Sequence, residues 1–336
     1  MEGTDIMRRR LNSTVLVTSR SFGVDDASLR EDLEAAVKEV RYNPYGRALT
    51  LEELRRAVGD VDGIIAGSEK IDASVFAAAP RLRVIARYGV GVDNIDLAAA
   101  REHGVVVTNA PGANAEAVAE LTIGFLFALS RSLSRIDRAV HAGQWPSLQG
   151  HEVGGKVVGL LGLGRIGQGV ARRALALGCT VMAYDPCINQ AFVDNYKVHV
   201  APLNEVVAQA HFLSLHLPLT AETRGLVDRS LLERMRPGSY LINTARGELL
   251  VEEDLLWALE SGPLRGAALD TLCDEPPPAD HPFLGREDII LTSHVGAHTT
   301  EAARAVGRIA LSELLAVLSG QAPRFAVSLS SEVHTP

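Results

Sequence analysis

The sequence predicts an α/β protein with doubly wound parallel sheets, and three observations support this prediction. Short apolar stretches of strand length alternate with helical stretches along most of the chain, as expected when helices cover both faces of a parallel sheet. A glycine-rich turn occupies residues 162–167, in the middle of the chain. The chain has 336 residues, of which 47% are apolar, enough for two hydrophobic cores. We therefore expect two domains.

The residues before the glycine-rich turn form the first series of alternating elements. Thr50 and Glu53 have the spacing of a capping box, and Asp96 can cap the helix that follows it. Alternation of this kind predicts a parallel sheet. We predict strands at residues 15–18, 63–66, 82–86 and 105–107, and helices at residues 27–38, from Thr50 onward, at 73–79 and at 96–104.

Residues 116–142 are predicted to form one long helix. Its first half is densely apolar and includes Val118, Leu121, Phe125 and Leu129. The apolar stripe of a solvent-facing helix is narrower than this. We therefore expect the helix to be buried between structural units.

The glycine-rich turn lies within a strand–turn–helix–strand unit. Apolar residues 156–161 precede the turn, a helical stretch at 170–177 follows it, and a second strand at 180–184 ends at Asp185. This order, with an acidic residue after the second strand, is the pattern of a dinucleotide-binding unit. A glycine-rich turn without that context would be weak evidence.

Each part of this unit has a physical role in binding a dinucleotide. Gly162 allows the tight turn, Gly164 lets backbone N–H groups approach a pyrophosphate, and Gly167 lets the helix pack closely on the strand. Asp185 can accept hydrogen bonds from the adenosine ribose and would repel a 2′-phosphate. The next two residues supply no arginine to bind such a phosphate. The sequence therefore favours NAD over NADP.

Polar side chains follow three strands of the second half of the chain, where strands are predicted at 211–216, 240–243, 266–269 and 288–291, before a last helix at 300–318. Arg246 follows the second of these strands, Asp270 and Glu275 the third, and His294 the fourth. Ligands of an open α/β sheet bind beyond the carboxyl ends of its strands, so we expect these side chains to converge where a nicotinamide would lie.

An arginine, a carboxylate and a histidine suit the reduction of a 2-keto acid. A guanidinium group binds the substrate carboxylate through two hydrogen bonds and polarises the carbonyl group. A histidine donates a proton to the developing alkoxide, and a carboxylate orients that histidine and favours its protonated form. Taken singly, Arg246 could be a surface residue, Glu275 a solvated loop acid and His294 a core histidine.

The turn that follows the strand at 82–86 is a candidate anion-binding element. Its glycines leave backbone N–H groups accessible as a nest for an anion, and Arg87 adds a cation. The alternative is a plain turn between a strand and a helix.

Composition narrows the classes of partner. The net charge is −8 and no basic stripe is present, so we do not expect a nucleic acid partner. We find no signal peptide or membrane span. Cys179, Cys187 and Cys273 lack CxxC spacing, which fits a reducing cytoplasm and argues against a zinc site. Cys273 is predicted to be a small filling side chain rather than a reactive thiol.

The motifs together resemble one known family over almost the whole chain, the NAD-dependent D-isomer-specific 2-hydroxyacid dehydrogenases. The chain most resembles the D-3-phosphoglycerate dehydrogenase branch. The segments that carry the resemblance are RYGVGVDNID at residues 87–96, NAPGANAEAVAE at 109–120, the turn at 162–167, INTARG at 242–247, residues 270–276 and HVGAHTTEA at 294–302.

The resemblance implies a domain organisation and a set of site residues. A Rossmann NAD-binding domain at residues 111–299 would be inserted in a discontinuous, flavodoxin-like substrate domain of residues 1–110 and 300–336, with homodimers formed through the NAD-binding domains. Arg246, Glu275 and His294 would be catalytic. Arg87 and the backbone of Val90 and Gly91 would contact the substrate, and no metal is expected. The implied cofactor contacts are Gly162, Gly164, Arg165, Ile166, Gly167, Asp185, Leu217, Thr244, Ala245, Asp270, Gly296 and Ala297.

The chain departs from the phosphoglycerate dehydrogenase pattern at several places. Gly67 stands where those enzymes usually carry an arginine before a serine, so a phosphate-binding cation is missing there, although Lys70 is close. Thr271-Leu272 replaces the usual Val-Phe, and Ser293 replaces the usual proline before the histidine. Because residues 319–336 are few, we expect no regulatory serine-binding module within this sequence. The reaction class is kept, and the substrate stays open.

We therefore expect an NAD-dependent oxidoreductase that interconverts a small D-2-hydroxy acid and its 2-keto acid. A hydroxypyruvate or glyoxylate reductase is an alternative within the same class. A relative of formate dehydrogenase is a weaker alternative, because that family pairs its histidine with a glutamine and this chain has Glu275. A dinucleotide-sensing, corepressor-like binding protein is the alternative from a different class.

Overall fold

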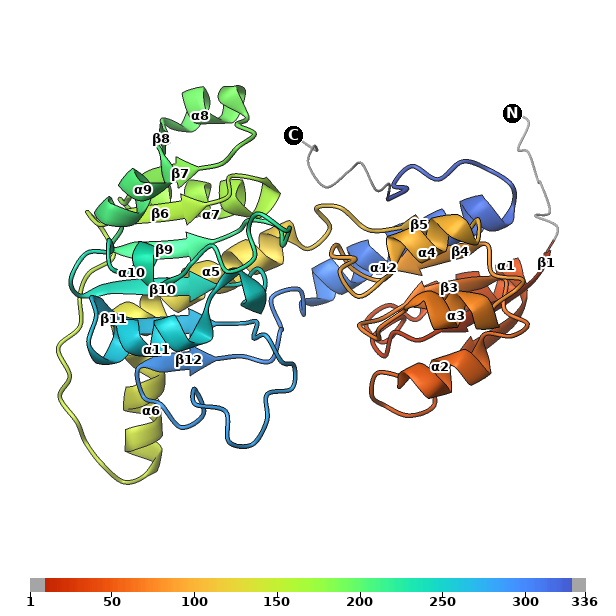
Figure 1. The fold of residues 1–336 in the computed structure, drawn as a ribbon, viewed down its shortest axis with the longest axis horizontal. Coiled ribbons are helices and arrows are strands. Elements are labelled where there is room, and N and C mark those ends of the chain that lie inside the picture. Colours follow the sequence, from red (N-terminus) through yellow and green to blue (C-terminus); the bar gives the residue numbers. More distant parts are fainter. Residues whose placement is uncertain (1–9, 328–336) are drawn as a thin grey trace. The chain divides into compact units, whose positions relative to one another are not determined.

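The computed structural model describes residues 10–327, which form two compact units. The first unit comprises residues 10–114 and 298–327, and the second comprises residues 115–297. Each unit contains a parallel sheet with helices packed on it (Figure 1). The predicted fold class of two parallel-sheet α/β domains is confirmed.

The first unit has a five-stranded sheet in the order β2-β1-β3-β4-β5, with all neighbours parallel. The order reverses between β1 and β3, the flavodoxin-like arrangement in which ligands bind beyond the strand ends at that reversal. The strands are β1 (Leu11–Val17), β2 (Val37–Tyr42), β3 (Gly63–Ala66), β4 (Val84–Arg87) and β5 (Val106–Thr108). The helices are α1 (Ser28–Ala36), α2 (Leu51–Ala57), α3 (Ala73–Ala78), α4 (Leu97–Glu102) and α12 (Thr300–Leu318).

Helix α12 brings the far end of the chain into this first unit. It packs on β3 and β4, beside which Figure 1 shows it in blue. The approach is close, because a Cβ atom at Gly63 would lie 2.9 Å from a methyl group of Leu314. The chain then returns along the sheet edge, where Ala326 forms an antiparallel bridge with Thr108 of β5. The first unit is therefore built from two separate stretches of sequence.

The second unit has a seven-stranded parallel sheet in the order β12-β11-β10-β9-β6-β7-β8. The order reverses between β6 and β9, and ligands of such sheets bind beyond the carboxyl ends of the strands at the reversal. The strands are β6 (Val157–Leu161), β7 (Thr180–Tyr184), β8 (His199–Val200), β9 (Phe212–Leu215), β10 (Ser239–Asn243), β11 (Leu264–Leu269) and β12 (Ile289–Leu291). The helices are α5 (Ala115–Ser130), α6 (Leu133–His141), α7 (Arg165–Ala176), α8 (Gln190–Tyr196), α9 (Leu203–Gln209), α10 (Arg229–Leu232), the 3₁₀ turn η1 (Gly247–Leu249) and α11 (Glu252–Glu260).

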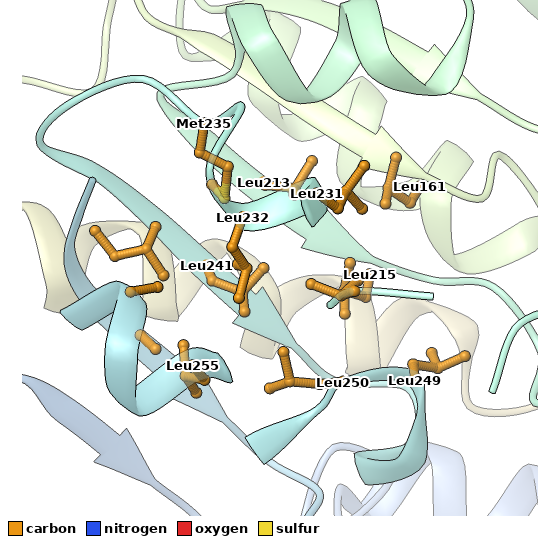
Figure 2. Close-up of a cluster of buried hydrophobic side chains, with 14 of the residues drawn as sticks. Leu161, Leu213, Leu215, Leu231, Leu232, Met235, Leu241, Leu249, Leu250 and Leu255 are labelled. Carbon is orange, nitrogen blue, oxygen red and sulfur yellow. The ribbon is translucent and has the colours of Figure 1, made fainter. Parts of the chain in front are cut away.

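A leucine-rich cluster fixes the strands that carry the predicted site. Figure 2 shows Leu213 and Leu215 of β9 and Leu241 of β10 packed with side chains from the α10 and α11 region, such as Leu232 and Leu255. All five side chains are at most 1% exposed. Because branched side chains at this density have little freedom to move, the carboxyl ends of β9 and β10 are held in place.

The predicted helix at residues 27–38 is wrong at its end. Helix α1 stops at Ala36, and residues 37–42 form β2, which pairs with β1 at the edge of the sheet. Most residues of β2 are exposed or partly exposed, so this strand lacks the apolar alternation that marks a half-buried strand.

The predicted single helix at residues 116–142 is also wrong. Helix α5 ends at Ser130, α6 begins at Leu133, and the two helices are bent by 66°. Ser132 has a φ angle of +52°, in the left-handed region, and the carbonyl group of Ser130 accepts a hydrogen bond from the N–H of His151. Helix α5 packs within the second unit, on α7, β10 and β11. Neither glycine nor proline marks the break in the sequence.

Among the described residues, no single helix is long and apolar enough to cross a membrane, although α5 and α6 together would pass such a test as a bent pair.

Candidate active site

The glycine-rich turn joins β6 to α7, and two of its glycines leave no room for a side chain. Gly162 has a φ angle of +105°, and a Cβ atom there would lie 2.6 Å from the carbonyl group of His216. A Cβ atom at Gly167 would lie 2.2 Å from the carbonyl oxygen of Gly162. Glycine is therefore required at both positions, because the turn lies directly against the end of β9 and the helix lies directly against the turn.

The start of α7 is open to a ligand. Gly164 is the N-cap residue, it is exposed, and a Cβ atom there would meet nothing within 4 Å. The helix begins at Arg165, and no side chain caps it at Gly164. The first N–H groups of any helix lack acceptors within the helix and carry partial positive charge, which favours phosphate. This open N-terminus fits the pyrophosphate of a dinucleotide.

Asp185 lies beside the same turn. One of its carboxylate oxygens accepts a hydrogen bond from the N–H of Leu163 at 2.6 Å, and the other accepts one from the N–H of Cys187 at 2.7 Å. These bonds fix the carboxylate just after β7 and beside Leu163, the residue between Gly162 and Gly164. An ordered carboxylate at this place fits the hydroxyl groups of an adenosine ribose.

Further predicted cofactor residues follow β9 and β10. Leu217 and Thr244 are buried, at 6% and 7% exposure. The hydroxyl groups of Thr244 and of Thr122 on α5 lie 3.1 Å apart. The side chain of Asn243 accepts a hydrogen bond from the N–H of Ala245 and donates one to the carbonyl group of Arg246, at 3.0 and 2.7 Å. Asn243 therefore shapes the turn that presents Arg246.

Glu275 and His294 are brought together by the structure. The Nδ1 atom of His294 lies 2.7 Å from Oε2 of Glu275, and the N–H of Leu272 donates to Oε1 of Glu275 at 3.1 Å. The side chains of His294 and Glu275 are 46% and 38% exposed. Because Nδ1 is the atom bound to the carboxylate, Nε2 is the atom left for proton exchange with a substrate.

The electrostatics of Glu275 favour its ionised form. Burial acts to raise the pKa of this carboxyl group, but the hydrogen bond and charge of His294, the N–H of Leu272 and the charge of Arg246 outweigh it and lower the pKa. Arg246 is therefore close enough to act on Glu275 through its charge. All three predicted catalytic residues belong to the second unit, at the carboxyl edge of its sheet.

Asp270 holds the loop of His294. Its carboxylate is only 2% exposed and accepts hydrogen bonds from the hydroxyl group of Thr292 at 2.6 Å and from the N–H groups of Val295 and Gly296 at 2.8 Å. The carbonyl group of Asp270 accepts a bond from the N–H of His294, whose φ angle is +56°. Asp270 thus fixes a left-handed backbone at His294, a conformation that few non-glycine residues adopt.

Gly296 and Ala297 complete this loop. A Cβ atom at Gly296 would lie 2.9 Å from Oδ2 of Asp270, so only glycine lets the loop close on the carboxylate. Ala297 follows as the last residue of the second unit.

His216 is a buried, neutral histidine. Its Nε2 atom lies 2.9 Å from the hydroxyl group of Ser214, and burial lowers its pKa to about 3. A histidine that stays neutral at physiological pH does not act as a proton donor.

The turn after β4 belongs to the first unit, and it directs its carbonyl groups inward. The guanidinium group of Arg87 donates to the carbonyl groups of Tyr88 and Gly91, and Asn109 donates to that of Val90 at 2.7 Å. The carbonyl group of Gly89 accepts from the N–H of Ala110. Because the C=O and N–H of one planar peptide point in opposite directions, the N–H groups of Val90 and Gly91 point away from these partners. Arg87 thus holds the carbonyl groups at the two ends of this turn, and Asn109 and Ala110 hold the two carbonyl groups between them.

Three contacts in the second unit were not predicted from the sequence. Glu252 at the start of α11 binds the loop of Glu275, His281 binds Glu252, and Thr292 binds Asp270. Glu252 could not be recognised from the sequence, because acidic residues are common in the first turn of a helix and α11 has three of them.

Cys273 is not an activated thiol. Burial and the nearby carboxylate of Glu252 raise its pKa to about 12. A thiol of this kind is a poor nucleophile at neutral pH. Cys273 is exposed, however, so the prediction of a small filling side chain is wrong. Among the residues that the structure describes, no group of three or more His, Cys, Asp or Glu side chains could hold a metal ion.

The comparisons with known proteins agree on one family. Residues 123–296 match the family model described as "D-isomer specific 2-hydroxyacid dehydrogenase, NAD binding domain". The chain is 40% identical over 297 residues to a D-3-phosphoglycerate dehydrogenase of Methanocaldococcus jannaschii, a match that covers 87% of this chain and 56% of that protein. It is 36% identical to a hydroxypyruvate reductase of Thermotoga maritima, over 84% of this chain and 94% of the reductase. The chain thus spans about half the length of the phosphoglycerate dehydrogenases that it matches.

Solved structures give the same result. The TT0316 protein of Thermus thermophilus superimposes with a TM-score of 0.84 at 37% identity, over 94% of this chain and 100% of that one. A D-lactate dehydrogenase of Lactobacillus jensenii, solved with NAD+, has a TM-score of 0.77 at 27% identity, over 94% and 99% of the two chains.

Proposed function

Because the chain belongs to the D-isomer specific 2-hydroxyacid dehydrogenase family, we propose that it uses NAD to interconvert a small D-2-hydroxy acid and its 2-keto acid. The observation that carries this proposal is the pair formed by His294 and Glu275, 2.7 Å apart at the carboxyl edge of the NAD-binding sheet, with the charge of Arg246 beside it. An imidazole held at Nδ1 by an ionised carboxylate is an oriented proton donor and acceptor.

Each of the three side chains has a distinct task in keto acid reduction. Arg246 binds the substrate carboxylate and polarises the carbonyl group. His294 donates a proton from Nε2 to the oxygen atom that becomes the hydroxyl group. Glu275 holds Nδ1 and stabilises the positive charge on the imidazole before the proton leaves. Bound NADH supplies the hydride that reduces the carbonyl carbon.

The residues of the second unit fit NAD. The open start of α7 at Gly164, Arg165 and Ile166 would hold the pyrophosphate. Asp185, fixed by two backbone N–H groups, would bind the ribose hydroxyl groups and exclude a 2′-phosphate. We place Leu217, Thr244, Ala245, Asp270, Gly296 and Ala297 around the nicotinamide half, with Asp270 acting through the loop that it holds.

The turn of the first unit would bind the substrate carboxylate. The N–H groups of Val90 and Gly91 share their peptides with the carbonyl groups of Gly89 and Val90. Those carbonyl groups accept hydrogen bonds from the N–H of Ala110 and the side chain of Asn109, so the two N–H groups point away from these partners. Two adjacent N–H groups held in this way form a nest for one carboxylate oxygen.

A substrate without a phosphate group is favoured by the loop after β3. Gly67 has no room for a side chain, because a Cβ atom there would lie 2.9 Å from Oε2 of Glu69 and 3.2 Å from the Cα atom of Ser19. Glu69 is 3% exposed and accepts hydrogen bonds from the hydroxyl group of Thr18 and the N–H of Gly67. A carboxyl group thus takes the space next to the position where a phosphate-binding arginine would stand. This favours a hydroxypyruvate or glyoxylate reductase as the second candidate.

A panel of 2-keto acids tests both candidates. NADH oxidation should be measured with phosphohydroxypyruvate, hydroxypyruvate and glyoxylate under the same conditions. We expect turnover of at least one of them. If the carboxyl group of Glu69 disfavours a substrate phosphate group, hydroxypyruvate and glyoxylate should be reduced faster than phosphohydroxypyruvate. Absence of turnover with every 2-keto acid would contradict the proposed reaction and support a non-enzymatic dinucleotide-binding protein.

We also propose a homodimer formed through α6 and the segment that follows it. Helix α6 has no buried residue, and Leu133, Val140 and Trp145 are 50%, 40% and 89% exposed. A cluster of exposed apolar side chains on one helix and the next segment is typical of an interface. Light scattering of the purified protein should give the mass of two chains, and Trp145→Ser with Leu133→Asp should give the mass of one.

The state of the cysteine residues bears on where in the cell the protein is found. Cys179, Cys187 and Cys273 are all unpaired in the structure. We propose a reducing compartment, the cytoplasm.

A further inference from the structure

The loop that carries Glu275 lacks regular secondary structure. It runs from Asp270 to Asp288, between β11 and β12. Backbone hydrogen bonds of a helix or strand do not fix such a segment, so its side chains must be positioned by other contacts. Glu275 itself accepts hydrogen bonds from the N–H of Leu272 and from the imidazole of His294.

Glu252 binds this loop at two points on either side of Glu275. Its Oε1 atom accepts a hydrogen bond from the N–H of Cys273, and its Oε2 atom lies 3.1 Å from Nε2 of His281. The Nδ1 atom of His281 accepts from the N–H of Phe283 at 3.3 Å, which assigns the proton of the neutral ring to Nε2. His281 therefore donates to Glu252. The carboxylate of Glu252 thus binds both ends of the segment 273–281.

His281 and Phe283 anchor the far side of the segment in the core. They are 8% and 1% exposed, and their rings contact edge to face with centroids 4.9 Å apart. Glu252 is itself anchored, since it is the first residue of α11. The contact therefore joins the loop to a rigid helix rather than to another loop.

The same short stretch of chain also carries Arg246. Gly247 follows Arg246 directly, and a Cβ atom there would lie 2.1 Å from the carbonyl carbon of Leu272 and 2.4 Å from the nitrogen of Cys273. The turn after Arg246 thus packs against the backbone at the start of the Glu275 loop. Residues 246–252 contact this loop twice, once through Gly247 and once through Glu252.

We propose that Glu252 and His281 are positioning residues that set the place of Glu275 relative to Arg246 and His294. This inference rests on the proposed function for its kinetic consequence, and on the hydrogen bonds alone for its structural one. Without Glu252 the N–H of Cys273 and the ring of His281 lose their shared acceptor. The loop then shifts, and Glu275 no longer presents Oε2 to His294 at a fixed distance.

Four variants test the proposal kinetically: Glu252→Ala, Glu252→Gln, the double variant Glu252→Ala with His281→Ala, and Glu253→Ala. Glu253→Ala is the matched control, because Glu253 is an exposed residue of the same helix. Glu252→Ala should lower kcat for 2-keto acid reduction about 10- to 100-fold without changing NADH affinity, since a small displacement of a catalytic group has an effect of this order. Glu252→Gln keeps one acceptor oxygen and should fall between wild type and Glu252→Ala. The double variant should lose no more than Glu252→Ala, since both residues act through one contact.

An NMR titration separates positioning from a merely structural role and does not need turnover. The Cε1–H resonance of His294, assigned by its loss in His294→Gln, is followed against pH. In Glu252→Ala its midpoint should move to lower pH, because a displaced carboxylate favours the protonated imidazole less. An unchanged midpoint with unchanged kcat would overturn the proposal. If the wild-type protein reduces no 2-keto acid, the proposed function fails, and the NMR shift still decides whether Glu252 positions Glu275.

Discussion

The two sheets of this protein present polar residues at the same kind of place and use them differently. In the first unit, Arg87 and Asn109 donate to the carbonyl groups of one turn, so their side chains shape the backbone. In the second unit, the imidazole of His294 donates to the carboxylate of Glu275, and the two side chains are 46% and 38% exposed. In the proposed function, the first edge offers N–H groups to an anion, and the second offers side chains that exchange a proton.

If the proposed function is correct, this difference separates substrate binding from proton transfer. An exposed, titratable pair needs support, and the second unit supplies it through buried groups such as Asp270, which is 2% exposed and holds the loop of His294. The turn of the first unit needs no titratable group, because backbone N–H groups bind an anion at any pH at which the protein folds. Changes at the two edges should therefore affect different kinetic constants.

The largest effect is expected at the second edge, from His294→Ala. Loss of the proton donor should lower kcat for 2-keto acid reduction about 10²- to 10⁴-fold. NADH affinity, measured by quenching of tryptophan fluorescence or by calorimetry, should stay at the wild-type value, because His294 is outside the glycine-rich turn. Near-normal turnover in this variant would show that the reactive edge has been assigned to the wrong residues.

Two glycines of the turn at 162–167 should give opposite phenotypes. Gly167→Ala places a Cβ atom 2.2 Å from a carbonyl oxygen, and this overpacking should lower the free energy of unfolding by about 1–3 kcal/mol. Gly164→Ala meets nothing within 4 Å and should leave stability within about 0.5 kcal/mol, while it weakens NADH binding by obstructing the pyrophosphate. Urea unfolding and NADH titration of both variants provide the check. Equal losses of stability in Gly164→Ala and Gly167→Ala would contradict the finding that the N-terminus of α7 is open at Gly164.

A smaller effect is expected at the first edge. Arg87→Met removes the donors that hold the carbonyl groups of Tyr88 and Gly91 and should raise KM for the keto acid about 10-fold, equivalent to about 1.4 kcal/mol. NADH affinity should not change. Arg101→Met is the control, because Arg101 is an exposed arginine on α4 of the same unit. A loss of kcat without a change of KM would indicate that Arg87 takes part in the chemistry.

The smallest effect concerns stability and pH. The pKa of Glu275 is lowered below its ordinary value of 4.5, so its ionised form is bound more strongly in the folded state. That contribution is present above about pH 4.5 and is lost as pH falls through the lowered pKa. The wild type should therefore lose its advantage in unfolding free energy over Glu275→Gln as the pH falls below about 4.5. A difference that grows on acidification would contradict this sign. The effect is small because both partners are partly solvated.

The sequence predicted those elements whose pattern is local. The capping box at Thr50 and Glu53 and the cap at Asp96 form as expected, because such caps depend on residues three positions apart. The strands β3, β7 and β10 were predicted because their apolar runs are continuous, as in buried parallel strands. Edge strand β2 and the break between α5 and α6 were missed, since their causes lie in tertiary contacts.

The candidate site shows the same division. The positions of Arg246 and His294 could be read from the rule that ligands bind beyond the ends of parallel strands. Their supports could not, because Glu252 contacts residues 21 and 29 positions away in the chain, and Thr292 contacts Asp270 across two strand ends. A hydrogen bond between residues so distant leaves no periodic trace in the sequence.

The most direct test of the account is a labelling experiment with NADH that carries deuterium on the transferable position of its nicotinamide. After reduction of a 2-keto acid by the wild-type protein, the product is analysed by mass spectrometry and by chiral chromatography. The account predicts one deuterium atom at C2 of a 2-hydroxy acid of D configuration. A product without deuterium at C2, or of L configuration, would contradict it.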